Sequence, residues 1–275
     1  MLENMLKDIC GADLFASIYE TLSINLFSPD GKYAMILDAV QTLYNVIMPI
    51  GVMVMFVYFL VNLEKSCVDE SFTWEKLWYQ FAMLLAAKFI MEHGFEILQL
   101  LFNIGLAITA KINNAISATN PEVTFDAAKM IEDFKAEWGF NGMLSFLSTA
   151  FLFCFLLLPW LMSWLMGLFV NLICYSRVIE IYVRAVMAPI ALSDFYHSGF
   201  QSTGWKFLKG FFAIALQGAL ILVISVIFSL MLQAILITDA RNMWTFIGSY
   251  LAFYGASCML MFKSLQLTKE LVGAV

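Results

Sequence analysis

The sequence predicts an all-α, polytopic integral membrane protein with about five (five to six) transmembrane helices, plus amphipathic helices in its N-terminal segment and in one loop. Hydrophobic residues make up 62% of the 275 residues and charged residues only 13%, whereas a soluble domain carries about 25% charged residues. Several apolar runs also reach the roughly 20 residues that a helix needs to cross a bilayer, and the mean hydropathy is +0.83. Part of the solvent around this chain must therefore be lipid.

Residues 1–38 are expected to form one or two amphipathic helices. The segment lacks the basic start and the continuous apolar core of a signal peptide. Its apolar residues recur at roughly helical spacing, namely Leu2, Met5, Leu6, Ile9, Leu14, Ile18 and Leu22. The apolar face would lie on the membrane or on a partner, or it would cover the protein's own spans, and both interpretations stay open.

Residues 39–275 are expected to form a single transmembrane domain. Its spans are predicted at about residues 39–62, 77–112, 144–174, 211–237 and 244–262. The second region exceeds one ordinary span and contains Gly94. Either Gly94 divides it into two half-helices or one helix extends well beyond the bilayer, and the sequence leaves both possible.

Two more helices are expected outside the bilayer core. Asn120 followed by Pro121 is typical of a helix start and predicts an extramembrane amphipathic helix at about residues 121–138. A second helix, at about residues 176–192, carries charges and is expected to be interfacial or re-entrant. It would be a sixth span if it crossed.

Basic residues set the expected orientation. Summed over alternating sides of five spans, Lys and Arg are more numerous by two on the side of the C-terminus. Because cytoplasmic loops carry the excess of these residues, we expect the N-terminus outside the cell and the C-terminus inside.

Three charged residues are predicted to share one face of the helix at residues 176–192. Glu180 is three residues after Arg177 and four before Arg184, so its carboxylate could pair with either guanidinium. One interpretation is an interfacial helix with a structural ion pair. The other is a face that lines a water-filled path or a contact between subunits.

A turn is predicted after this helix. Pro189 should kink or end the helix nearby, Asp194 can cap the following turn, and Gly199 permits tight backbone there. Asp194 and His197 are best explained by a hydrogen bond within this turn.

The start of the next span has the residues of an interfacial anchor, namely Trp205, Lys206 and Lys209. Further along the same span come a polar side chain and two small residues, Gln217, Gly218 and Ala219. Small residues let helix backbones approach closely, so this trio is expected to serve helix packing or to place a polar point in a pore.

Charges also interrupt the region at residues 77–112. Lys88 and Glu92 have the spacing of an ion pair within one helix, and Glu96 follows. Ionisable groups inside a membrane span face protein or water rather than lipid.

No enzyme, cofactor or metal site is predicted. The sequence contains no phosphate-binding GxxxxGK[ST] loop and no GxSxG or GxGxxG motif, and it has only two histidines. Its basic residues are few and scattered, so no dedicated nucleic-acid-binding site is expected.

The stretch "SRVIEIYVRAVMAPIALSDFYHSGFQSTGWKFLKGFFAIALQGALILVI", residues 176–224, resembles the TrbL and VirB-six family. The matching features are the Glu/Arg helix that ends in "APIA", the acidic residue and glycine of the turn, "GWKFLK" and "ALQGA". The similarity is to versions found in mobile elements of Gram-positive bacteria. These proteins are inner-membrane subunits of type IV secretion and conjugation machines.

The resemblance implies a channel or scaffold subunit in the bacterial cytoplasmic membrane that helps DNA or protein to cross it. It also implies a homo-oligomer in the lipid bilayer, with other secretion subunits as partners, including a P-loop ATPase, and possible transit of single-stranded DNA. Two alternatives from the residues stay open, a secondary transporter of a small solute and a holin-like pore protein. No paired, related halves of the transporter kind are recognisable.

Overall fold

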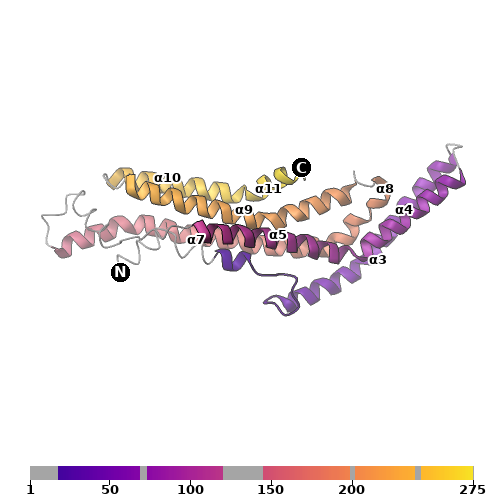
Figure 1. The fold of residues 1–275 in the computed structure, drawn as a ribbon, viewed down its shortest axis with the longest axis horizontal. Coiled ribbons are helices and arrows are strands. Elements are labelled where there is room, and N and C mark those ends of the chain that lie inside the picture. Colours follow the sequence, from indigo (N-terminus) through magenta and orange to yellow (C-terminus); the bar gives the residue numbers. More distant parts are fainter. Residues whose placement is uncertain (1–17, 69–72, 120–144, 199–201, 239–242, 275) are drawn as a thin grey trace. The chain divides into compact units, whose positions relative to one another are not determined.

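A computed structural model describes residues 18–68, 73–119, 145–198, 202–238 and 243–274. All regular secondary structure in these ranges is helical (Figure 1). The helices are α3 (Ala34–Val68), α4 (Trp74–Glu92), α5 (Gly94–Thr119), α7 (Ser145–Leu192), α8 (Phe195–Ser198), α9 (Thr203–Thr238), α10 (Met243–Phe262) and α11 (Ser264–Val272). The predicted all-α class is confirmed.

Four of the described helices are long and apolar enough to cross a membrane. The apolar stretches are Ala34–Cys67 in α3, Gly94–Ile116 in α5, Phe153–Leu192 in α7 and Thr203–Phe228 in α9. A shorter apolar helix, Ile247–Phe262, lies within α10. These helices support the predicted polytopic membrane protein.

The region at residues 77–112 forms two helices. His93 ends α4, and α5 begins at Gly94. A Cβ at position 94 would lie 2.6 Å from both Leu192 Cδ1 and Tyr44 Oη, so a larger residue there would require these side chains to move. The Tyr44 hydroxyl donates a hydrogen bond of 2.6 Å to the Met91 carbonyl, in the last turn of α4.

Residues 176–192 are not a separate helix, because α7 runs without interruption from Ser145 to Leu192. Neither Pro159 nor Pro189 ends it. Proline removes one backbone donor and favours a bend, but the helix continues through both positions. The expected interfacial or re-entrant helix is therefore the C-terminal part of a 48-residue helix. A position at the membrane interface for this part stays a prediction.

Several expected boundaries differ from the structure. Residues 18–22 are helical, but residues 23–33 form turns and bends, and α3 then begins at Ala34. Similarly, α9 begins at Thr203, eight residues before the predicted start of the span. The predicted helix at residues 121–138 and the first 17 residues of the N-terminal helical prediction lie outside the described residues.

The chain divides into two compact units. Unit 1 comprises Met1–Ser23, Ile108–Tyr175 and Gly218–Ser264, and unit 2 comprises Ile24–Ala107, Ser176–Gln217 and Leu265–Val275. Each has its own buried apolar core. In unit 1 that core includes stacked rings, with Phe228 and Phe253 centroids 4.9 Å apart and Tyr250 fully buried.

The core of unit 2 surrounds Phe27. This ring is 2% exposed and packs against Phe95, Phe102 and Tyr182 at centroid distances of 5.6, 5.3 and 6.4 Å. The Tyr182 hydroxyl donates a hydrogen bond of 2.8 Å to the Leu26 carbonyl. The segment before α3 is thereby fixed to α7, and unit 2 contains most of the charged residues singled out in the sequence.

Candidate functional site

The Arg177 side chain joins three helices of unit 2. It is only 4% exposed. Its Nε donates a hydrogen bond of 3.0 Å to the Ile214 carbonyl, and its Nη2 donates one of 3.0 Å to the Ala215 carbonyl. The guanidinium also lies 5.9 Å from the ring centroid of Phe102, within reach of a cation–π interaction. Arg177 therefore links α7 to the backbone of α9 and to a ring on α5.

The main chains of α5 and α9 approach closely at this junction. A Cβ added to Gly105 would lie 2.7 Å from the Ala215 carbonyl oxygen. Because no larger residue fits there without moving a backbone, Gly105 sets the separation of the two helices. The planar fork of arginine suits two neighbouring acceptors, and here those acceptors are successive carbonyls of one helix.

Glu180 pairs with Arg184. The distances from Glu180 Oε1 to Arg184 Nη2 and Nε are 2.8 and 3.2 Å, and the two side chains are 30% and 25% exposed. Arg184 Nη1 also lies 3.0 Å from the Cβ position of Gly210, so this glycine leaves room for the guanidinium. The sequence allowed Glu180 to pair with either arginine. In the structure it pairs with Arg184, four residues away, whereas Arg177 binds the α9 carbonyls.

The turn after α7 is held by polar side chains. The Pro189 carbonyl accepts a hydrogen bond from Ser193 N at 3.1 Å. Asp194 Oδ2 accepts one of 2.7 Å from the backbone of Thr203, so the predicted cap acts on the start of α9. Gly199 and the His197 side chain lie outside the described parts of the chain, so the predicted bond between Asp194 and His197 stays a prediction.

The predicted anchor residues lie within the first two turns of α9. Ser202 Oγ accepts a hydrogen bond of 3.2 Å from Trp205 N, as an N-cap residue does. Trp205 packs against the core of unit 2, whereas Lys206 is exposed and Lys209 is half-buried. Lys206 and Lys209 therefore lie within the first turns of α9 and not in the segment before it.

The trio in the middle of α9 is buried. Gln217 is 5% exposed and Ala219 is 6% exposed, and Gly218 is buried as well. Burial favours the helix-packing interpretation of these residues over a position on an open wall.

The charged residues around the break between α4 and α5 are exposed. Lys88 Nζ lies 3.6 Å from Glu92 Oε1, with side chains 52% and 44% exposed. Glu96 Oε2 lies instead 3.1 Å from His93 Nδ1. Within the described residues, no group of three or more His, Cys, Asp or Glu side chains could hold a metal ion.

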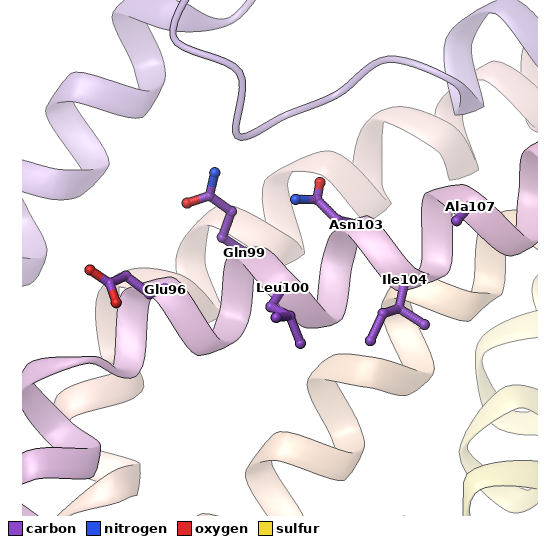
Figure 2. A pocket seen from close by; sticks show the side chains of 6 residues that line it. All are labelled: Glu96, Gln99, Leu100, Asn103, Ile104 and Ala107. Carbon is purple, nitrogen blue, oxygen red and sulfur yellow. The ribbon is translucent and has the colours of Figure 1, made fainter.

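A second polar surface, which the sequence reasoning missed, lies on α5. A hollow of about 420 Å³ runs along this helix (Figure 2). Its lining residues are Glu96, Gln99, Leu100, Asn103, Ile104 and Ala107. The spacing of residues 96, 99 and 103 would have revealed the surface, because these residues share one helix face.

These observations define a class: a polytopic α-helical membrane protein whose charged side chains partly join helices and partly face outward. The chain matches the TrbL/VirB6 plasmid conjugal transfer-like family over residues 27–189, which is more than half its length. The chain therefore belongs to this family and is a multi-pass membrane component of a conjugal-transfer type IV secretion system. No curated protein and no solved structure matches it.

The matched range confirms the family but changes which residues carry the similarity. It begins at residue 27 and includes α3, α4 and α5, and it ends at Pro189. It thus contains Arg177, Glu180 and Arg184, while the turn, the anchor and the "ALQGA" segment lie beyond it. The family is one of secretion-system subunits rather than of enzymes.

Proposed function

We propose that this chain is a channel or scaffold subunit of a conjugative type IV secretion system, and that it helps DNA or protein to cross the bacterial cytoplasmic membrane. The observation that carries the proposal is the family match over residues 27–189. That range includes three of the four candidate spans and all three charged residues of the Arg177–Arg184 face.

The structure suggests separate roles for these charges. Arg177 is buried and bonded to two main-chain carbonyls, which suits a residue that holds helices in place. Glu180 and Arg184 form a close pair that is still about one quarter to one third exposed. A partly exposed pair can contact water, substrate or a neighbouring subunit, so it is the part of this face with a proposed role in transport.

The proposed partners follow from the family to which the chain belongs. In a secretion system of this kind, a separate P-loop ATPase would supply the energy. We further propose a homo-oligomer in contact with other secretion subunits, with single-stranded DNA in transit rather than bound at a dedicated site.

Removal of the ion pair tests the role in transfer. Arg184→Ala and the double variant Glu180→Ala/Arg184→Ala should lower conjugation frequency about tenfold, the equivalent of about 1.4 kcal/mol, while both proteins still insert into the membrane. Lys65→Ala removes an exposed cation on α3 and serves as the matched control. Normal transfer by the double variant would show that the pair has no role in transport.

Reconstitution separates this function from that of a solute transporter. Purified protein in liposomes should show no ion-coupled uptake of small solutes. Coupled uptake would contradict a secretion subunit, whatever the conjugation assay shows.

A further inference from the structure

The outward side of α5 carries polar side chains beside two exposed aliphatic ones, Leu100 and Ile104, whereas its inward side is apolar. Leu98 and Phe102 are 0% and 1% exposed and belong to the core of unit 2. On another side of the helix is a row that we call the α5 polar stripe, defined as Glu96, Gln99, Asn103 and Ala107. At 3.6 residues per turn, positions 96, 99, 103 and 107 fall within a sector of about 80°. Figure 2 shows Gln99 and Asn103 projecting to the same side of α5.

The stripe is exposed, and its polar atoms are poorly satisfied by the protein. The Glu96 side chain is 76% exposed. Gln99 Nε2 makes only a long hydrogen bond, 3.5 Å, to the Phe27 carbonyl. Asn103 is exposed and makes no hydrogen bond with any other described residue. Transfer of an amide without a partner into hydrocarbon costs about 4–8 kcal/mol, so lipid is a poor neighbour for this surface.

The same unit shows what a lipid-facing surface looks like in this protein. From residue 46 to residue 61, α3 contains no charged and no amide side chain. Met53, Phe56 and Val57 are exposed there at 68%, 50% and 56%. Both α3 and α5 contain candidate spans. The exposed face of α3 suits hydrocarbon, whereas the α5 polar stripe does not.

The space along the stripe has room for water. The hollow of about 420 Å³ is large enough for several water molecules at roughly 30 Å³ each. Ala107 lines one end of the hollow, and the exposed Glu96 carboxylate with its His93 neighbour lies at the other end. A carboxylate is hydrated far better by water than by a packed protein surface.

We propose that the α5 polar stripe faces a water-filled path through the assembled secretion subunit. The inference rests on the proposed function, because the stripe would form part of the wall of the path that a channel subunit provides. Its amides can donate and accept hydrogen bonds with water. The two amides are neutral and hold neither an anionic nor a cationic substrate by charge, and the one carboxylate of the stripe, Glu96, lies at its end.

The alternative occupant is a second copy of this chain. Asn and Gln side chains can hydrogen-bond across membrane helices, and such a contact would fill the hollow and exclude water. The two occupants differ in how a thiol on the stripe would react.

Cysteine accessibility distinguishes them. Asn103→Cys, Gln99→Cys and the nearly isosteric Ala107→Cys would be produced in cells that carry the whole secretion system, and treated with a membrane-impermeant quaternary-ammonium methanethiosulfonate. Met53→Cys on the apolar face of α3 and Leu98→Cys in the core are the controls. Because the chain already has five cysteines, the reaction is followed at each site by peptide mass spectrometry.

Each stripe position should react at least about tenfold faster than both controls, because the thiolate is the reactive form and needs water. Reaction no faster than at the controls would overturn the proposal. Protection of Asn103→Cys together with a disulfide between two copies would also overturn it, in favour of a contact between copies.

The labelling result is independent of the transfer assay. Slow labelling together with impaired transfer in the Glu180/Arg184 variants would contradict a water-filled path along the stripe but would still support the proposed function. Fast labelling in cells whose conjugation does not require this chain would instead contradict the proposed function.

Discussion

At the scale of single residues, Arg177 is the charge whose surroundings differ most from those of an ordinary ion pair. It is buried, and it donates hydrogen bonds to two main-chain carbonyls of α9. Hydrogen bonds from a charged donor contribute about 1.5–3 kcal/mol. The two bonds depend on a flat group with donors at a fixed spacing, which lysine does not have.

Arg177→Lys should therefore lower the free energy of unfolding by about 2–3 kcal/mol, since it keeps a buried charge but loses the two-point contact. The thermal unfolding midpoint of the purified protein in detergent measures this. Arg184→Lys is the control, with an expected change below about 1 kcal/mol because its pair is partly exposed. Equal midpoints for Arg177→Lys and the parent chain would contradict the assigned role.

The contacts of Arg177, Glu180 and Arg184 also show what could and could not be predicted from the sequence. Helical spacing indicated that Arg177, Glu180 and Arg184 lie near one face, and that Glu180 pairs with an arginine. It could not choose between the two arginines, because both spacings favour a pair. It also could not reveal that carbonyls 37 and 38 residues away are the partners of Arg177, since no side chain marks an available carbonyl.

At the scale of helices, glycines determine how close the elements of unit 2 come. A Cβ at Gly51 would lie 2.6 Å from the Pro189 carbonyl oxygen, and one at Gly105 would lie 2.7 Å from the Ala215 carbonyl oxygen. Both contacts are with backbone, which cannot rotate away as a side chain can. Close approach of this kind is typical of membrane helices, whose association depends on packing rather than on the hydrophobic effect.

Gly105→Ala should destabilise the protein by about 1–3 kcal/mol, the usual effect of forcing extra atoms into a packed site. Gly255→Ala is the matched control on α10, because its Cβ would meet no described atom within 4 Å. There the better helix propensity of alanine should give no loss, or a gain of up to about 1 kcal/mol. Thermal unfolding in detergent compares the two, and equal behaviour would show that Gly105 does not set the spacing.

Helix boundaries were the least predictable part of the fold. The break at Gly94 was visible in the sequence, but the choice between one and two helices depends on Tyr44 and Leu192, which pack around it from distant parts of the chain. The charges after residue 176 suggested a new helix, yet α7 continues to Leu192. Local composition predicts where a chain becomes polar, whereas tertiary packing determines where a helix ends.

At the scale of the whole molecule, composition was sufficient for the fold class. With 62% hydrophobic residues, the chain has too much apolar surface for a water-soluble domain of this size, and the long apolar helices are the result. The division into two units was not predictable, because each unit is assembled from three separated segments. The polar stripe on α5 was not predicted, because isolated amide side chains hardly change a hydropathy profile.

The predicted orientation is tested on the whole chain. A fluorescent protein fused after Val275 should fold and fluoresce, and alkaline phosphatase at the same position should be inactive, because the C-terminus is expected in the cytoplasm. A fusion after residue 30, before α3, should give the opposite pair of results. An active phosphatase at the C-terminus would reverse the proposed topology.

The two bonds of Arg177 also impose an order on biosynthesis. Ala215 follows Arg177 by 38 residues, and at about 5–20 residues per second the ribosome delivers it roughly two to eight seconds later. Throughout that interval the guanidinium is permanently charged and its acceptors have not yet been made. The end of α7 therefore has to wait beside the insertion machinery, or at the level of the lipid headgroups, until α9 emerges. The two helices then enter their final positions as a pair.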